Sequence, residues 1–201
     1  MTTSRKESQA WSVLIVSTLA FTVCFMVWMM FGVIGIPIKK MLNLNATEFG
    51  LLTATPVLSG SLIRVPLGIW TDKYGGRIVM TILMALTVPA IWLMSYATVY
   101  WHFLVIGLFV GLAGGSFSVG TPYVARWFPK GKQGMAMGVY GAGNSGSAVN
   151  KFIAPALLVS FGWAVVPQVY AAVMLGTVVL FWFFSYSDPT HLVATNVTFS
   201  E

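Results

Sequence analysis

The stretch Gly68-Ile69-Trp70-Thr71-Asp72-Lys73-Tyr74-Gly75-Gly76-Arg77 joins two apolar runs, near residues 46–70 and 78–97. It holds three charged residues in ten positions, whereas charged residues make up only 8% of the 201-residue chain. A helix crosses about 30 Å of hydrocarbon with about 20 apolar residues, and each run has that length. Asn45, with Glu48 three residues later, is typical of a capped helix start before the first run. We therefore interpret the stretch as a short polar turn between two membrane-spanning helices.

The composition of the whole chain is that of a membrane protein. Hydrophobic residues make up 57% of it and the mean hydropathy is +0.83, whereas a soluble domain usually carries about 25% charged residues. The net charge of +6 lies in short clusters, which excludes a cytosolic enzyme, a disordered chain and a nucleic-acid-binding domain. Cys24 is the single cysteine, so a disulfide framework is excluded too. The interruptions between apolar runs predict an N-terminal segment at 1–10, six spans near 11–38, 46–70, 78–97, 101–128, 134–160 and 163–187, and a tail or start of a central loop at 188–201.

The basic residues of the short loops predict how the spans are oriented. Lys39 and Lys40 are the only ones on one side, whereas seven lie on the other side. This excess predicts that both termini lie in the cytoplasm. We expect a multi-pass protein of the plasma membrane, which is the inner membrane of a bacterium. The seven are Arg5, Lys6, Lys73, Arg77, Arg126, Lys130 and Lys132.

The chain contains a faint internal repeat. Gly35-Ile36-Pro37 aligns with Gly120-Thr121-Pro122 at an offset of 85 residues, and Ser59-Gly60-Ser61 aligns with Ser145-Gly146-Ser147 at an offset of 86. Chance coincidence of small residues is one explanation. The other is an all-α membrane fold of two three-helix inverted repeats, in which a transporter binds its substrate near the middle of the membrane.

Arg64 is the strongest candidate for a binding residue. It lies inside the 46–70 span, where an arginine at the helix centre costs about 2.5–3.5 kcal/mol, and no Asp or Glu lies at comparable depth in any span. One interpretation is that its side chain extends toward the interface near Trp70. The other is that it binds an anion beside the small residues Gly60 and Gly68. A planar guanidinium favours a planar oxyanion that accepts two parallel hydrogen bonds.

The 134–160 span carries a second group of candidates. Asn144 and Lys151 are seven residues apart and share one helix face, and Lys151 has no carboxylate partner within the spans. Gly143 and Gly146 allow a ligand or another helix to approach the backbone closely, so a substrate wall and a helix-packing seam both remain open.

Aromatic rings form a third group of candidates. Trp28 and Phe31 are three residues apart, a spacing that can place them on one face, and flat rings can sandwich a flat anion.

Enzymatic and metal chemistry have no support in the sequence. Gly141-Ala142-Gly143-Asn144-Ser145-Gly146 fits the dinucleotide fingerprint by its letters, but no strand precedes it. His102 and His191 have no cysteine or carboxylate at ligand spacing. Because no nucleophile, base and oxyanion hole come together, we expect neither an enzyme nor a cofactor or metal site.

The opening stretch resembles the signature loop of the major facilitator superfamily. The resemblance implies a cytoplasmic gating turn in which Asp72 caps a helix and pairs with Arg77 or Arg126 in the state closed to the cytoplasm. The residues of this gating loop are Gly68, Asp72, Gly75, Arg77 and Arg126.

Residues 138–146, preceded by Phe128-Pro129-Lys130-Gly131-Lys132-Gln133-Gly134, resemble the nitrate signature of the nitrate/nitrite porter family. This resemblance implies that Arg64 binds nitrate, that Asn144 lies at the site and that Phe117 is the aromatic residue of the fourth span. Lys151, followed by Phe152 and Ala154-Pro155, resembles the proton-coupled nitrate branch.

The family resembled has twelve helices, so the chain corresponds to its N-terminal six-helix half. We expect transport of nitrate, nitrite or both, with protons as coupled ions, membrane lipid around the chain and no nucleic acid partner. The site would consist of Arg64, Asn144, Phe117, Phe31, Lys151, Gly143 and Gly146. The missing half would be a C-terminal six-helix unit or a second copy, so a truncated product, a split transporter and a dimer are all consistent. A facilitator for oxalate or formate and a non-transporting membrane fragment are the alternatives.

Overall fold

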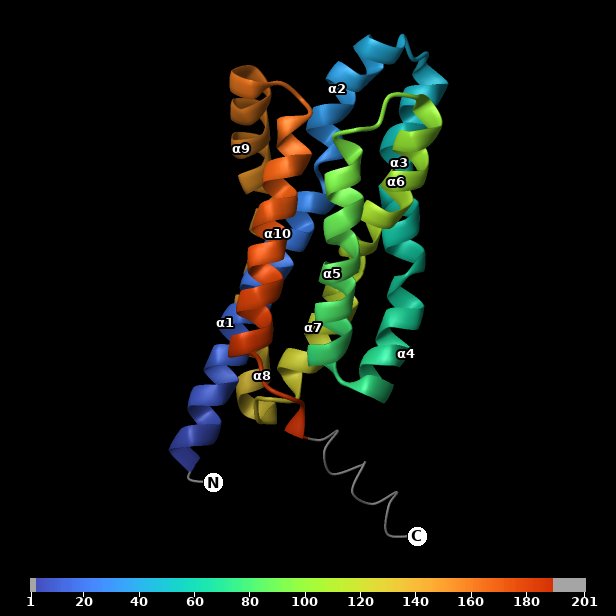
Figure 1. The fold of residues 1–201 in the computed structure, drawn as a ribbon. Coiled ribbons are helices and arrows are strands. Elements are labelled where there is room, and N and C mark those ends of the chain that lie inside the picture. The colour runs from blue at the N-terminus through green and yellow to red at the C-terminus, as the bar shows by residue number, and fades with distance from the viewer. Residues whose placement is uncertain (1–2, 190–201) are drawn as a thin grey trace.

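A computed structural model describes residues 3–189, with side chains from residue 6 onward, and every regular element in this range is a helix (Figure 1). His191 and residues 190–201 of the expected tail lie outside the described residues. The elements in chain order are α1 (Thr3–Trp28), α2 (Phe31–Leu42), α3 (Ala46–Leu62), α4 (Arg64–Tyr74), α5 (Gly76–Met94), α6 (Tyr100–Gly111), η1 (Leu112–Gly115), α7 (Ser116–Ala125), α8 (Lys130–Gly141), η2 (Ala142–Ser145), α9 (Gly146–Phe161) and α10 (Val165–Phe184).

These elements form six passes through one bundle. The passes are α1–α2, α3–α4, α5, α6–η1–α7, α8–η2–α9 and α10, and the start of α1 lies at the same end of the bundle as the end of α10 (Figure 1). We call this the terminal end and the opposite one the far end. The predicted all-α architecture of six passes is therefore confirmed.

Five stretches are long and apolar enough to cross a membrane: Lys6–Leu42, Ala46–Tyr74, Gly76–Met94, Tyr100–Ala125 and Val165–Phe184. The pass α8–η2–α9 is not among them, since it is rich in glycine and contains Asn144, Asn150 and Lys151. The least apolar pass is thus the one that carries the second group of candidate residues.

Four of the six passes are broken near their middle. The first is interrupted at Met29–Met30, and the second at Ile63, three residues before Pro66, which has no N–H to donate to Leu62. In the fourth and fifth passes the glycine-containing segments η1 and η2 form short 3₁₀ turns. Breaks of this kind change which residues share a helix face.

The internal repeat is visible in the packing. A Cβ atom at Gly60 would lie 2.7 Å from the carbonyl oxygen of Gly111, and one at Gly146 would lie 2.1 Å from the carbonyl oxygen of Thr22 and 3.0 Å from the nitrogen of Met26. Met26 and Gly111 are 85 residues apart, which matches the offset of the repeat. A close approach of a glycine to a neighbouring helix backbone therefore occurs at both repeat positions, between α3 and α6 and between α9 and α1.

The expected capped start of the second pass is also present. The Asn45 side chain accepts a hydrogen bond from the Glu48 backbone N–H, and the Glu48 carboxylate accepts one from the Asn45 N–H, both at 2.9 Å. This capping box fixes the start of α3 at Ala46.

Candidate functional site

Arg64 is the first residue of α4, directly after the break in the second pass. Its guanidinium carbon lies 5.7 Å from the centre of the Trp28 ring, and within residues 6–189 it forms no ion pair. Its Nε is buried and has no hydrogen-bond partner among these residues. The Trp28 indole N–H is held by the Pro56 carbonyl oxygen at 2.9 Å, which fixes the ring. Arg64 therefore rests on an aromatic face and keeps polar hydrogens for an acceptor.

A row of aromatic rings extends from the ring under Arg64. On α1, the Phe25 ring centre lies 5.3 Å from that of Trp28 and 5.6 Å from that of Phe21. Phe21 in turn lies 5.7 Å from Phe117 of α7 and 4.9 Å from Tyr140 of α8. The structure thus brings Phe117, which is 43% exposed, into the same row as the ring partner of Arg64.

Phe31 does not belong to this row. It is 2% exposed, and its ring atom Cζ lies 3.4 Å from the position that a Cβ would take at Gly107 of α6. The break at Met29–Met30 separates Phe31 from Trp28, so their three-residue spacing does not place them on one face. Phe31 is a core residue between α2 and α6.

A cavity of about 560 Å³ lies between the first and fifth passes. It brings Asn144 and Lys151 together, and Phe25 of the aromatic row lines it too. The Asn144 side-chain amide donates to the Gly141 carbonyl oxygen at 2.8 Å, and Lys151 is exposed. The remaining lining residues are Met29, Gly32, Val33, Ser147 and Asn150.

Gly143 and Gly146 pack against α1 and do not face the cavity opening. A Cβ at Gly143 would lie 2.3 Å from Cδ1 of Phe21, and one at Gly146 would meet the α1 backbone at Thr22. Both glycines are buried. The structure places them in a helix-packing seam, and this close approach brings Asn144 beside Phe25.

Asn150 is a polar residue whose role the sequence did not reveal. It is 2% exposed; its amide donates to the Met29 carbonyl oxygen at 3.0 Å, and its own oxygen accepts from the Tyr170 hydroxyl at 2.7 Å. It ties the break in the first pass to the fifth and sixth passes at the wall of the cavity. At the repeat offset of 86 residues Asn150 aligns with Arg64, and this is the sequence signal that could have found it.

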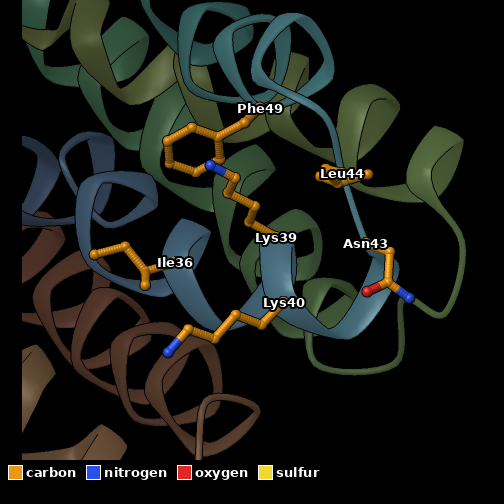
Figure 2. A pocket seen from close by; sticks show the side chains of 6 residues that line it. All are labelled: Ile36, Lys39, Lys40, Asn43, Leu44 and Phe49. Carbon is orange, nitrogen blue, oxygen red and sulfur yellow. The ribbon is translucent and has the colours of Figure 1, made fainter.

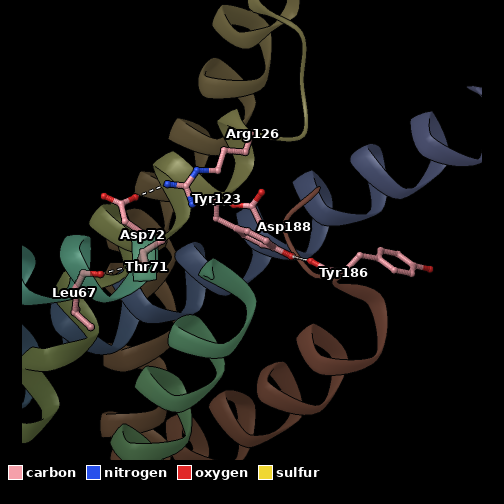
Figure 3. A network of polar contacts seen from close by, with 7 residues as sticks. All are labelled: Leu67, Thr71, Asp72, Tyr123, Arg126, Tyr186 and Asp188. Atoms are coloured by element: carbon pink, nitrogen blue, oxygen red, sulfur yellow. Dashed lines mark hydrogen bonds and ion pairs between the residues drawn. The ribbon is translucent and has the colours of Figure 1, made fainter. Parts of the chain in front are cut away.

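A polar network links the passes at the terminal end (Figure 3). Arg126, which follows α7, forms ion pairs with Asp72 of α4 and, at 2.8 Å, with Asp188, which follows α10. Burial lowers the pKa of Arg126, but the hydrogen bonds and charges of Asp188 and Asp72 outweigh this and raise it above its usual value. Nearby, the Tyr123 hydroxyl donates to the Tyr186 carbonyl oxygen. Three passes are thus held together at this end.

The other residues of the gating loop have separate roles. Arg77 donates to the Trp182 carbonyl oxygen at 2.7 Å and stacks 4.3 Å from the Trp182 ring, so it ties α5 to α10 instead of pairing with Asp72. Gly75 makes the turn between α4 and α5 with φ of 86°, which favours glycine. A Cβ at Gly68 would meet nothing within 4 Å, so packing in this structure does not explain that glycine.

The far end carries a different cavity, of about 480 Å³ (Figure 2). The Lys39 ammonium lies 5.0 Å from the Phe49 ring centre, and Figure 2 shows Lys40 extending in another direction. Asn43, at the end of α2, has a left-handed conformation with φ of 51°. These two lysines are far from Arg126 and its partners, at the opposite end of the bundle (Figure 1).

Among the side chains of residues 6–189, no group of three His, Cys, Asp or Glu residues comes together as a metal site would require. Cys24 is buried and forms no disulfide. The chemistry that these side chains offer is hydrogen bonding and charge.

Comparison with known proteins adds two kinds of likeness. Residues 16–198 match the Major Facilitator Superfamily. A protein named probable nitrate/nitrite antiporter NarK1 from Thermus thermophilus is 43% identical over 183 residues, which cover 85% of this chain and 41% of the relative. The nitrite extrusion protein of Bacillus subtilis is 36% identical, with 76% and 39% covered, and the probable nitrate transporter NarT of Staphylococcus carnosus is 32% identical, with 88% and 46% covered.

Solved structures show the same fold at low identity. An inward-facing bacterial homologue of the human lysosomal transporter Spinster superposes with a TM-score of 0.79 at 18% identity and covers 90% of this chain and 44% of that chain. The inward-open xylose transporter XylE from E. coli gives 0.73 at 17%, with 92% and 50% covered. The chain therefore spans between about two fifths and one half of the proteins it matches.

Proposed function

The chain belongs to the major facilitator superfamily, a family of transporters, and on this basis we propose that it forms the N-terminal six-helix half of a carrier for nitrate or nitrite. The superpositions confirm that the chain has half of a major facilitator fold, as predicted. Because its family consists of transporters, the chain is not an enzyme. The relatives named for nitrate or nitrite support the substrate class.

The observation that carries the proposal is the setting of Arg64. Its charge lies within a membrane-spanning pass, rests on Trp28 and faces no carboxylate within residues 6–189. A half-buried cation without a counter-charge attracts an anion. Nitrate and nitrite are flat or bent oxyanions that accept two parallel hydrogen bonds from a guanidinium.

The neighbouring groups fit a small planar anion. Phe117 and Phe25 supply flat apolar faces, while Asn144 and Lys151 supply donors at the adjoining cavity. In this proposal Arg64 anchors the anion and Phe117 contacts its face. Asn144 and Lys151 guide it through the cavity between the first and fifth passes. Phe31, Gly143 and Gly146 position these groups through packing.

Uptake of an anion into a cell with an inside-negative potential costs about 2.3 kcal/mol per 100 mV for each charge. Glu48 and Asp72 lie at opposite ends of the second pass, so the six spans offer no carboxylate in their middle to carry a proton. We propose proton coupling through Lys151, the bound anion or the second six-helix unit. Exchange of one anion for another is the competing mode.

The same proposal places the protein in the plasma membrane with both termini in the cytoplasm. The ends of the passes at the terminal end carry most of the loop lysines and arginines, and the far end carries Lys39 and Lys40 (Figure 1). A second six-helix unit, C-terminal or a second copy, would complete the proposed site to which Arg64 and Lys151 belong.

The test is nitrate accumulation in cells that lack their own nitrate carriers, with the chain expressed alone and with a C-terminal six-helix unit. Arg64→Lys keeps the charge but loses the planar fork, so we expect uptake by the assembled carrier to fall about tenfold or more. Lys40→Gln at the far end is the matched control and should leave uptake unchanged.

Three results would contradict the proposal. Unchanged uptake by Arg64→Lys would show that the Arg64 guanidinium does not anchor the anion. Stronger competition by oxalate or formate than by nitrite would indicate a facilitator for organic anions. Membrane insertion without uptake in any combination would indicate a non-transporting fragment.

A further inference from the structure

A separate cavity of about 360 Å³ lies at the terminal end, outside the proposed anion pathway. Its walls come from the first turns of α1 and from the connection between α7 and α8. The lining residues are Lys6, Glu7, Ala10, Trp11, Trp127, Phe128, Pro129 and Lys132.

The cavity is positively charged. Lys6 and Lys132 line it, against one carboxylate, that of Glu7. The Lys132 ammonium is 3.4 Å from that carboxylate, and both side chains are more than half exposed, at 60% and 63%. A long, exposed ion pair of this kind is weak. The lysine is therefore available to a stronger anionic acceptor.

Trp127, one of the lining residues, carries a hydrogen-bond donor without a partner among the described residues. The indole N–H of Trp127 is buried and has no acceptor among the described residues. Tryptophan can only donate at this atom, and a buried donor without an acceptor is unfavourable. Helix α8, which is twelve residues long, starts beside Trp127. Its first turn has no side-chain cap and no acidic residue, so its backbone N–H groups have no acidic side chain next to them. These donors all suit one negatively charged oxygen group.

The depth of the cavity identifies the kind of ligand. The candidate span of the first pass begins at Lys6, and that of the fourth pass ends at Ala125, so the cavity lies at the ends of both candidate spans. Trp11 packs edge-on against Phe128 at 5.9 Å, and tryptophans are typical of this interfacial layer. These positions favour a ligand that has a charged headgroup and an adjoining apolar part.

We propose that this cavity binds the phosphate group of an anionic phospholipid such as phosphatidylglycerol. The phosphate accepts from Lys6, Lys132 and the Trp127 N–H, while Trp11 and Phe128 contact the adjoining apolar part of the lipid. Lysines beside membrane-spanning helices attract anionic headgroups in this way. The proposal concerns lipid binding and holds whether or not the chain carries nitrate.

The test uses the full chain purified in detergent, with lipid binding measured by native mass spectrometry against phosphatidylglycerol and phosphatidylcholine of equal acyl length. We expect binding of phosphatidylglycerol to be stronger, and to weaken about fivefold for each lysine removed in Lys6→Gln and Lys132→Gln. Trp127→Phe should weaken it as well. Glu7→Gln should strengthen it, because the competing carboxylate is gone.

The matched control is the double variant Lys39→Gln, Lys40→Gln, which removes the same charge from the far-end cavity of Figure 2 and should keep the preference. Equal binding of the two lipids would overturn the proposal, as would an equal loss in the control. Displacement of the lipid by millimolar inorganic phosphate would overturn it in favour of a free oxyanion site. Glu7→Gln predicts a gain, so the test survives if a lysine variant fails to fold.

Discussion

At the scale of single residues, half-buried Arg64 and buried Asn150, which lie one repeat apart, have different surroundings. Arg64 keeps polar atoms without partners, whereas both ends of the Asn150 amide are bonded, to Met29 and Tyr170. An unsatisfied cation can bind a ligand, and a satisfied amide holds helices together. Asn144, six residues earlier on the same pass, is exposed at the cavity and bonds only within its own turn.

We therefore predict that substitution of Asn150 affects stability and that substitution of Asn144 affects nitrate binding. Asn150→Ala removes two bonds between passes and should lower the free energy of unfolding in detergent by about 1–2 kcal/mol. Asn144→Ala should leave stability within about 0.5 kcal/mol and weaken nitrate binding by the assembled carrier. Thermal unfolding and nitrate binding, measured on the same samples, separate the two effects. Equal destabilisation by both variants would contradict this assignment.

At the scale of elements, glycines set how closely the helices approach. The seam between α9 and α1 depends on Gly146, where an added Cβ would meet the Thr22 backbone at 2.1 Å. Backbone atoms cannot turn aside as a flexible side chain can, so the two helices would have to separate. The aromatic row and the cavity both lie along this seam.

Gly146→Ala should accordingly destabilise the protein by about 1–3 kcal/mol. It should also reduce nitrate uptake, because the cavity wall moves away from α1. Gly138→Ala is the matched control on the same pass, since a Cβ there meets nothing within 4 Å. Melting temperatures that fall by the same amount in both variants would show that the seam does not limit packing.

At the scale of the whole molecule, arginine side chains join distant passes at the terminal end of the bundle. Arg126 joins Asp72 and Asp188 across three passes, and Arg77 joins α5 to the end of α10. Asp188 has no exposed side-chain surface, whereas that of Asp72 is 67% exposed. The buried pair with Asp188 should therefore matter more for holding these passes together than the exposed pair with Asp72.

The charge difference between the ends predicts the topology. A fluorescent protein that folds only in the cytoplasm should be active when fused to either terminus, and a periplasmic phosphatase should be active when inserted after Asn43 in the turn between α2 and α3. Fusions between α4 and α5 should behave like those at the termini. The reverse pattern would overturn the proposed orientation while leaving the fold intact.

The sequence alone determined the features that depend on transfer of residues between water and hydrocarbon. Apolar runs of sufficient length defined six passes, and the capping pair Asn45 and Glu48 fixed the start of α3. The sequence also shows that no Asp or Glu lies in a span at the depth of Arg64. These features are local or additive along the chain, so they need no knowledge of neighbouring helices.

Only the tertiary structure decided which way the side chains face. The breaks at Met29–Met30 and in η2 change the helix phase, so Phe31 turns into the core and Gly143 packs against Phe21. Arg77 donates a hydrogen bond to Trp182 near the end of α10 and does not pair with Asp72. Asn150 forms hydrogen bonds with Met29 and Tyr170, which are 121 and 20 residues away in the sequence. Such choices depend on contacts between distant segments, and a helix period assumed to be regular cannot predict them once the helix is broken.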